Sequence, residues 1–516
     1  MIMKRMTLLL LVLVLFSLVA PRLVAAEEFA HSKEVDKLAA ELQADGFIVQ
    51  EGDYKMIDIL RLCSEGWLKY CFGNNAGFPY LAYLLPPAPG QKPSRGQKPP
   101  VGFDPHDPNN FPANIDFIPP GITYKLRPDE AILFVGKTPP QARYFSYRSY
   151  VGFVANKPGK DYSDVFTLDT GEGGFYHRVF ASLGDPLNHL NKFTSGTPNG
   201  KPGNAFNRET VLITSAHQGI NKRVRKALKK AGISMSIVND DVIPLSLVNM
   251  GLEKGKDTFL VLTRAALWQD EAEGRAFLTE PTKTCRVFRL TPKQELAAGP
   301  YPVPELRQRG NGISEFKIVP NAAADLETVR RAILKKYGSP HYKAKELHTS
   351  IWLPEGYIGI SDDLDVLAED RDTTYLKTDD FQLRSDDDFI IVYGVNHEKT
   401  GKAIYCNISF YGRELLNGVA GTNSALFTGS AREYLPADYQ NAGYYYVVKI
   451  ARKKSAPDED CVIVEKSTGN PKGKAYGVDN NKEAYIAFRS YIEKPNQVGP
   501  AHFELIYDRA ILFTKK

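Results

Sequence analysis

The sequence predicts a mainly β protein made of two related β-sandwich-like domains that arose by internal duplication, with a few inserted or flanking helices. The first observation is that PDEAILFV at residues 128–135 resembles PDEDCVIV at residues 457–464. The second is that YFSYRSYV at residues 144–151 resembles YIAFRSYI at residues 485–492, in the same order along the chain. Similar segments in a conserved order indicate repeated structural units.

Each repeated unit has the composition of a pair of β-strands. An acidic start that favours a turn leads into an apolar, β-branched run, and a connection rich in Gly, Pro and Lys leads into a second run of alternating character. This pattern is typical of a β-hairpin. Two weaker copies follow the same plan, namely SDDDFIIV (385–392) with YCNISFYG (405–412), and KDTFLVL (256–262) with CRVFRL (285–290).

The amino-terminal end has the features of a secretory signal peptide over residues 1–26. Lys4 and Arg5 form a basic start, an apolar run follows, and small residues suited to cleavage end the segment. An uncleaved membrane anchor is the competing interpretation, but a span needs about 20 apolar residues, and Pro21 and Arg22 interrupt the run. We therefore expect an exported protein, periplasmic or secreted, with no membrane span after signal cleavage.

The mature chain divides into four parts by composition. These are N-terminal helices with a Pro/Gly-rich wrapping segment (27–114), a first β domain with an inserted helix (115–300), a linker and connecting helix (301–374), and a second β domain (375–516). Apolar residues at helical spacing predict helices over residues 32–44, 54–63, 221–231 and 325–337.

The five cysteines suggest disulfides, because an oxidising compartment preserves them. Cys63 and Cys71 are close in sequence, and Cys406 and Cys461 lie in neighbouring predicted strands. Sequence alone settles neither pairing. The odd count leaves at least one thiol over, and the apolar pattern around Cys285 predicts that it is this one and that it is buried.

The charge balance argues against a dedicated nucleic-acid binder. The net charge of the whole chain is +5, and loss of Lys4, Arg5 and Arg22 with the signal leaves about +2. A nucleic-acid-binding protein shows a concentrated basic excess instead. The basic face of the predicted helix at 221–231 is better explained as a solvated surface than as a contact with an acidic polymer or anionic lipid.

The main candidate for ligand contact is an arginine placed between two tyrosines in each of the two stronger copies. Alternate side chains of a strand share a face. The face so defined carries Tyr144, Arg148 and Tyr150 in the first copy, and Tyr485, Arg489 and Tyr491 in the second.

Such a face can stack on a flat ligand or hold an anion. The alternative is structural: each arginine covers the surface of its sheet, or pairs with Asp129 and Asp458 of the same predicted hairpins.

A stretch of closely spaced carboxylates between the two β domains offers the oxygen ligands that calcium prefers. The first group is Asp362, Asp363 and Asp365, and Glu369, Asp370 and Asp372 follow. The stretch lacks the spacing and the glycine of an EF-hand, so a solvated acidic loop is the alternative interpretation. No other cofactor is predicted.

Motifs of known catalytic sites are missing from the sequence, which has no G-x-S-x-G, H-E-x-x-H or C-x-x-C pattern. The leading hypothesis is a non-enzymatic binding or scaffold protein for a small molecule, a glycan or an envelope component. The alternative is a secreted hydrolase of polysaccharide or ester bonds. It would use carboxylates such as Glu172, Asp185 and Asp240, gathered by the fold.

Overall fold

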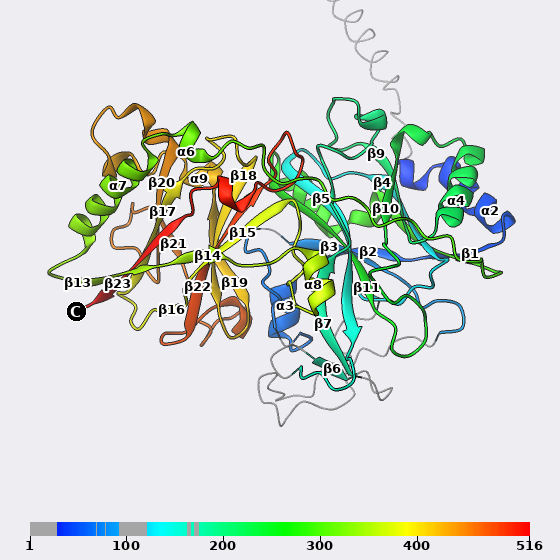
Figure 1. Cartoon of the computed structure of the whole chain (residues 1–516), viewed down its shortest axis with the longest axis horizontal. Coiled ribbons are helices and arrows are strands. Elements are labelled where there is room, and N and C mark those ends of the chain that lie inside the picture. Colours follow the sequence, from blue (N-terminus) through cyan, green and yellow to red (C-terminus); the bar gives the residue numbers. More distant parts are fainter. Residues whose placement is uncertain (1–27, 69, 78, 92–120, 163–166, 170–174) are drawn as a thin grey trace, which may run out of the picture.

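The computed structural model describes residues 28–68, 70–77, 79–91, 121–162, 167–169 and 175–516. It contains four β-sheets arranged one behind another along the long axis of the molecule, with helices at both ends (Figure 1). The predicted fold, mainly β with two related sandwich-like halves, is confirmed. The predicted signal peptide and residues 92–120 of the predicted wrapping segment lie outside the described residues.

The first half is a sandwich of an outer and an inner sheet. The outer sheet has the order β1 (Phe47–Glu51), β12 (Cys285–Pro292), β4 (Ala131–Lys137), β9 (Glu209–Ser215), β10 (Val238–Val242). The inner sheet has the order β2 (Asp53–Ile57), β3 (Tyr80–Leu84), β11 (Phe259–Trp268), β5 (Ala142–Ala155), β7 (Phe175–Ser182), β6 (Thr167–Asp169), and β8 (Leu187–Asn188) pairs with β5. Strands β1, β2 and β3 come from the predicted N-terminal segment.

The second half repeats this arrangement. Its outer sheet has the order β13 (Tyr342–Leu347), β23 (Arg509–Lys515), β17 (Phe389–Val395), β20 (Tyr445–Ala451), β21 (Cys461–Ile463). Its inner sheet has the order β14 (Thr349–Ile351), β15 (Thr373–Thr378), β22 (Glu483–Tyr491), β18 (Tyr405–Gly412), β19 (Asn417–Asn423), and β16 (Phe381–Gln382) pairs with β22. In both halves the last two strands of the outer sheet pair in parallel.

The halves correspond in strand order, but not where their sequences look most alike. When strands are matched by their positions in the sheets, β4 corresponds to β17 and β5 to β18. Strands β17 and β18 contain the weaker copy at residues 385–392 and 405–412. The stronger sequence match pairs β4 and β5 with β21 and β22, whose structural counterparts are β10 and β11. The predicted alignment of the copies is therefore wrong, because strands buried in similar ways acquire similar residues whatever their place in a sheet.

The repeated units are not hairpins. β4 lies in an outer sheet and β5 in an inner sheet, and β17 and β18, β21 and β22, and β11 and β12 are divided between layers in the same way. The alternation of side chains reports which faces of a strand are buried, but it does not identify the hydrogen-bonded neighbour. The prediction that one face of each strand fills the core is confirmed by the buried side chains of Phe145, Val151, Ile486 and Phe488.

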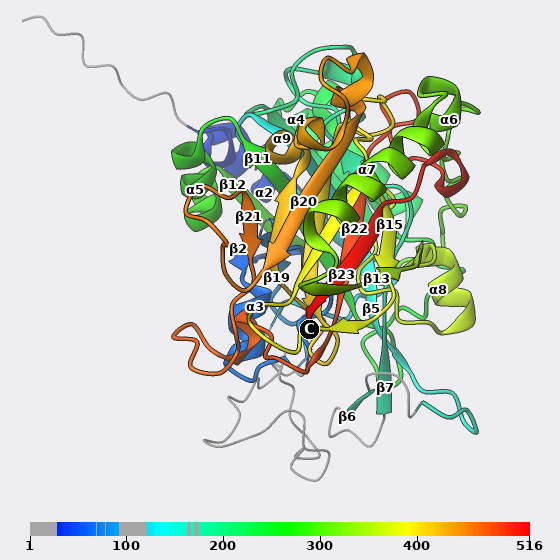
Figure 2. The same cartoon turned by 90° about the vertical axis from the view of Figure 1, so that its left-hand side faces the viewer.

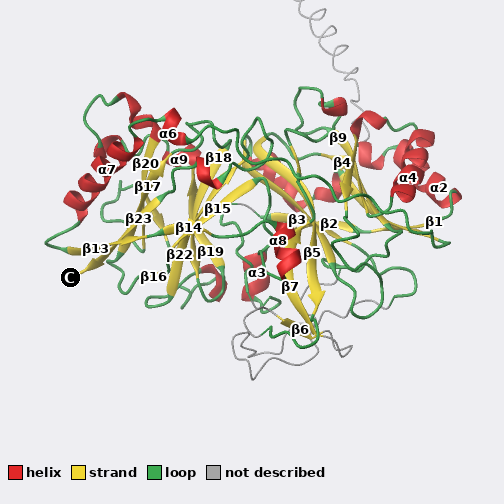
Figure 3. Ribbon diagram, viewed as in Figure 1, coloured by secondary structure: helices red, strands yellow, loops and turns green. Residues whose placement is uncertain are grey.

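The longest helices lie at the two ends of the stack, and shorter helices also lie near its middle, as Figure 3 shows. The described helices are α2 (Lys33–Ala44), α3 (Ile59–Ser64), α4 (Gln218–Ala231), α5 (Glu271–Thr279), α6 (Glu315–Ile318), α7 (Ala322–Tyr337), α8 (Gly356–Asp362) and α9 (Ser424–Phe427). Helices α2 and α4 pack on the first outer sheet, and α7 lies across the second (Figure 2). The predicted helices at 32–44, 221–231 and 325–337 are thus confirmed. None of the described helices is long and apolar enough to cross a membrane.

Helix α4 follows from its sequence. The His217 ring accepts hydrogen bonds from the backbone N–H groups of Gly219 and Ile220 at the first turn. Gly232, at a φ of 92°, ends the helix in the left-handed conformation that glycine adopts without steric penalty. The predicted apolar stripe is buried against the outer sheet, as Val224 and Leu228 show.

The predicted helix at 54–63 is wrong. This segment forms strand β2 and then the short helix α3, which begins where the Asp58 carboxylate accepts the N–H of Arg61 at 2.9 Å. Apolar residues of a strand followed directly by a short helix imitate the spacing of one longer helix.

One of the two candidate disulfides is present. Cys63 and Cys71 are bonded to each other. Cys406 and Cys461 are free and belong to different sheets, so this candidate pairing is not formed. Cys285 is buried, as predicted.

The two inner sheets face each other across a buried interface, which we call the seam, and part of this interface is apolar. Tyr144 and Ala266 of the first half pack there against Tyr405, Tyr491 and Ile492 of the second. The aromatic rings are in contact: the centroids of Tyr144 and Tyr491 lie 5.0 Å apart. The two halves are therefore joined by a buried interface in addition to the chain that links them.

This interface predicts that the halves stay together when the linking chain is cut. A specific protease site inserted directly after Val303, which is exposed, should yield two fragments on a denaturing gel. On native size-exclusion chromatography the nicked protein should elute at the volume of the uncut insertion variant. Separate elution of the fragments would show that the linker, and not the seam, joins the halves.

Candidate functional site

The six predicted ligand-contact residues are all buried, and Tyr144, Tyr491 and Arg489 lie at the seam. Arg148 and Arg489 are each only 4% exposed, and the four tyrosines are buried more completely. The proposed structural partners also differ from the prediction: Arg148 pairs with Asp241 at 3.0 Å, while Asp129 pairs with Arg127. The Arg/Tyr faces therefore form part of an internal interface.

Two short segments cross the seam in corresponding ways. We call residues 72–77, which precede β3, the first arm, and residues 367–372, which precede β15, the second arm. Each begins with two residues of positive φ: Phe72 (56°) and Gly73 (65°) in the first, Leu367 (54°) and Ala368 (55°) in the second. Left-handed backbone is uncommon for Phe, Leu and Ala, so it indicates that surrounding contacts hold the arms in place.

An arginine of each half binds the arm of the other half. Arg264 of β11 donates to the carbonyl of Ala368 at 2.9 Å, and Arg489 of β22 donates to the carbonyl of Gly73 at 3.0 Å. Each guanidinium also donates to a tyrosine hydroxyl of its own inner sheet, on Tyr150 and Tyr411 respectively.

The ladder registers confirm that these contacts correspond. Arg264 lies opposite Tyr80 and Arg489 opposite Tyr375, the first tyrosine after each arm. The hydroxyl of Tyr80 accepts the N–H of Asn75, and that of Tyr375 accepts the N–H of Asp370. The structural counterpart of Arg489 is thus Arg264, which sequence reasoning missed because it aligned Arg489 with Arg148.

The second arm carries the second group of carboxylates of the acidic stretch. Glu369, Asp370 and Asp372 are buried at 2% exposure or less. Arg264 binds Asp370 at 2.8 Å, and Asn188 of the first half donates to Asp372 at 2.6 Å. The interpretation of this part as a solvated loop is wrong, because its carboxylates find cationic and amide partners across the seam.

Burial changes the acidity of this arm. Burial and the neighbouring Glu355 together raise the pKa of Glu369 to about 7. Burial, together with Asp370, raises the pKa of Asp372 well above its usual range. Glu369 accepts a hydrogen bond from the hydroxyl of Ser182 in the opposite half. A carboxyl group of this kind can hold a proton near neutral pH, but here it is enclosed by protein.

Two of the three carboxylates proposed for calcium are paired with basic side chains. Asp363 lies 2.7 Å from Lys157 and 2.9 Å from Lys160, and Asp365 pairs with Arg178. Asp362 accepts the hydroxyl of Ser361 at the surface. In the part of the chain that the structure describes, no group of three His, Cys, Asp or Glu residues is placed to hold a metal ion.

The carboxylates named for a hydrolase do not gather into one site. Asp185 pairs with Arg371 at 2.6 Å within the seam, whereas Asp240 pairs with Arg225 near helix α4. Glu172 lies outside the described residues.

An open cavity of about 370 Å³, which we call the seam cleft, lies where the two halves meet. Its buried apolar residues are Ala142, Phe206, Ala403 and Ile404, and Arg143 and Lys494 are exposed. The complete lining is Ala142, Arg143, His189 and Phe206 from the first half, and Glu398, Gly401, Ala403, Ile404 and Lys494 from the second.

The basic side chains of the cleft differ in whether an acidic partner balances their charge. Arg143 lies 3.3 Å from Glu398, which also accepts the hydroxyl of Ser424 at 2.6 Å. Lys494 makes no ion pair with any acidic group of the described residues. Burial lowers the pKa of His189 to about 4, so its ring is neutral at pH 7. The Nδ1 atom of that ring is buried without a hydrogen-bond partner among the described residues.

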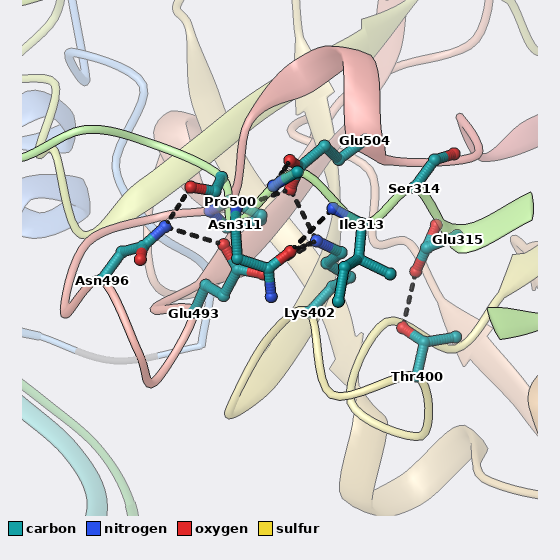
Figure 4. A network of polar contacts seen from close by, with 12 residues as sticks. Asn311, Ile313, Ser314, Glu315, Thr400, Lys402, Glu493, Asn496, Pro500 and Glu504 are labelled. Atoms are coloured by element: carbon teal, nitrogen blue, oxygen red, sulfur yellow. Dashed lines mark hydrogen bonds and ion pairs between the residues drawn. The ribbon is translucent and has the colours of Figure 1, made fainter. Parts of the chain in front are cut away.

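A buried network fixes two walls of the cleft (Figure 4). Lys402 is 1% exposed and lies between the cleft residues Gly401 and Ala403. Its Nζ lies 2.8 Å from Glu493 and 2.6 Å from Glu504. Because Glu493 immediately precedes Lys494, this ion pair joins the loop of Gly401 to the strand end that carries Lys494.

His397 fixes the beginning of the same loop. Its ring lies 2.7 Å from Glu315 and 3.5 Å from Asp508. Burial by itself lowers the pKa of His397, but the two carboxylates outweigh it and raise the pKa to about 10. The protonated ring is therefore a fixed cation of the interior at neutral pH.

Comparisons with known proteins give no identity. No protein-family model matches the chain, and no curated protein matches it. Among solved structures, an uncharacterised protein from Burkholderia cenocepacia is 9% identical with a TM-score of 0.33, over 93% of this chain and 95% of that one. The VPA0106 protein from Vibrio parahaemolyticus is 10% identical with a TM-score of 0.29, over 76% of this chain and 88% of that one. At these scores neither similarity carries an argument about this protein.

The seam contacts predict different effects for the two corresponding arginines. Arg264→Met leaves Asp370 as a buried unpaired charge and should lower the free energy of unfolding by roughly 3–5 kcal/mol. Arg489→Met leaves only a carbonyl and a hydroxyl without their donor and should lower it by roughly 1–3 kcal/mol. Urea denaturation measures both, with the exposed Arg331→Met as the control. Equal midpoints for all three variants would contradict this account of the seam.

The pKa of His397 predicts a loss of stability at alkaline pH. The folded-state pKa of about 10 lies above the ordinary value of 6.5, so the stabilisation is complete below pH 6.5 and disappears as the pH rises through 10. The difference in unfolding free energy between the wild type and His397→Gln should be roughly a few kcal/mol at pH 6 and should shrink towards pH 10. A difference independent of pH would show that His397 is neutral when folded.

Proposed function

We propose that the chain is an exported, non-enzymatic binding protein in which two related halves form one rigid scaffold. The signal-like sequence at residues 1–26 supports export to a periplasm or to the exterior. The bond between Cys63 and Cys71 supports it as well, since structural disulfides persist in oxidising compartments. The ligand is a small molecule, a glycan or an envelope component.

The observation that carries the proposal is that the ionisable side chains at the seam are buried in ion pairs, whereas the cleft has an exposed charged side chain. At the seam, Asp370 and Arg371 are buried in ion pairs that hold the halves together. In the seam cleft, by contrast, Lys494 is exposed. The volume of this cleft, about 370 Å³, lies within the range of roughly 300–1,000 Å³ that is usual for small-ligand sites, which often form between domains. These features favour binding over chemistry.

A secreted hydrolase of polysaccharides or esters remains the second candidate because of Glu369. Its pKa of about 7 suits a general acid. The carboxyl group is 2% exposed and bonded to Ser182, however, so substrate would reach it only if the halves separated. The ion pairs across the seam oppose such a movement.

The proposal predicts no turnover by the purified mature chain on a panel of chromogenic glycosides and esters, measured between pH 5 and 8. The Glu369→Gln variant should be folded and equally inactive, since this residue serves the seam. Turnover by the wild type that the Glu369→Gln variant loses would establish the hydrolase instead.

Export is tested separately on cells that express the full chain. Fractionation should find the protein outside the cytoplasm, and mass spectrometry should find an amino terminus near Glu27 and no free thiol at Cys63 or Cys71. An intact first segment in the cytoplasmic fraction would refute export.

A further inference from the structure

The seam cleft lies where corresponding positions of the two halves meet. Arg264 contacts Tyr150, and its counterpart Arg489 contacts Tyr411, so Tyr150 and Tyr411 occupy corresponding positions in the two halves. Counting six residues back along each strand shows that Tyr144 corresponds to Tyr405. These two rings approach each other to 6.1 Å between centroids. A residue that touches its own counterpart lies close to the approximate two-fold axis that relates the halves, so the neighbouring cleft lies close to that axis too.

The side chains of the cleft do not follow this symmetry. By the same register Ala142 corresponds to Ala403, and Arg143 corresponds to Ile404; all four line the cleft. One half thus contributes a cation where the other contributes a buried apolar side chain. A ligand that fits both walls has a charged end and an apolar end.

The net charge of the cleft is close to one positive charge at neutral pH. Glu398 offsets Arg143, Lys494 has no acidic partner among the described residues, and the ring of His189 is neutral. A single negative charge on the ligand would balance this site, whereas a dianion would leave an excess. Electrostatic complementarity of this kind selects partners by charge.

The apolar part of the cleft is aromatic and rigid. The ring of Phe206 lies 5.4 Å from that of His189 and 5.1 Å from that of Phe145, so its position is set by the core. Ile404 of the other half is 7% exposed and also lines the cleft. Apolar surface of this kind, close to a few polar groups, is usual in sites for small organic ligands.

The walls are also held in place before any ligand binds. Lys402 and Glu493 pair internally at 2.8 Å, on the residues adjoining Ala403 and Lys494. A preorganised site loses less conformational entropy when it binds. The cleft therefore has fixed walls, a cation on its rim and an apolar floor.

From these observations we infer that the seam cleft binds a small organic monocarboxylate. The carboxylate lies at Lys494, and the apolar body lies on Phe206 and Ile404. This inference rests on the proposed binding function and specifies the chemical class of its ligand.

The test uses benzoate and hexanoate as probes, titrated into the full mature chain and followed by ligand-detected NMR and calorimetry. Both should bind, and added salt should weaken them. Benzamide, which has the shape of benzoate without its charge, should bind at least roughly fivefold more weakly, and Lys494→Gln should weaken benzoate by a similar factor, the share of one partly exposed ion pair. Inorganic phosphate, which lacks the apolar body, should not displace benzoate.

The control is Lys399→Gln, which removes an exposed lysine near the cleft that does not line it. This variant should bind benzoate as the wild type does, and thermal unfolding should show that both variants are folded. Failure of both carboxylates to bind the wild type, or equal binding by Lys494→Gln and Lys399→Gln, would overturn the inference. Such a result would leave the binding function itself standing if the substrate panel shows no turnover, whereas turnover would overturn that function.

Discussion

The exchange of contacts between two arginines and two arms is the constraint on which the rest of the structure depends. Arg264 reaches the arm of the second half and Arg489 the arm of the first, so each half completes the other. The inner sheets carry polar and charged side chains on the faces that meet. Burying these side chains would cost free energy if they had no hydrogen-bond or ion-pair partners. The reciprocal contacts therefore make a polar interface compatible with burial.

The two contacts between an arginine and an arm are alike in geometry and different in charge. At the position of Asn75 in the first arm, the second arm has Asp370, which forms an ion pair with Arg264. Asn75 instead donates to the hydroxyl of Tyr491 at 2.8 Å. A neutral amide and a carboxylate of similar shape thus occupy the same place. The two halves share the same backbone arrangement, but the side chains at corresponding positions differ. The side chains that line the cleft differ between the halves in the same way.

The sequence is sufficient to predict the mainly β class, the duplication, three of the four helices and the buried face of the repeated strands, because each of these follows from local periodicity and repetition. It is insufficient for the partners of each strand, since a buried face is equally satisfied in a hairpin or across two sheets. The surroundings of Arg148 and Arg489 cannot be predicted for the same reason. An arginine between tyrosines looks identical in sequence whether the face meets a ligand or another sheet. The cleft residues His189 and Lys494 carry no local motif, and only the meeting of the halves brings them together.

Buried charge explains why the cleft has a defined shape. Lys402 and His397 sit in the interior with two carboxylates each, and removing such groups from water is unfavourable unless every partner is in place. A loop held by both residues therefore has few alternative conformations, because any shift of its backbone would separate a buried cation from its carboxylates. Gly401, Ala403 and Ile404 lie on this loop and line the cleft. The buried ion pairs of Lys402 and His397 therefore hold this part of the cleft in place, although neither residue lines it.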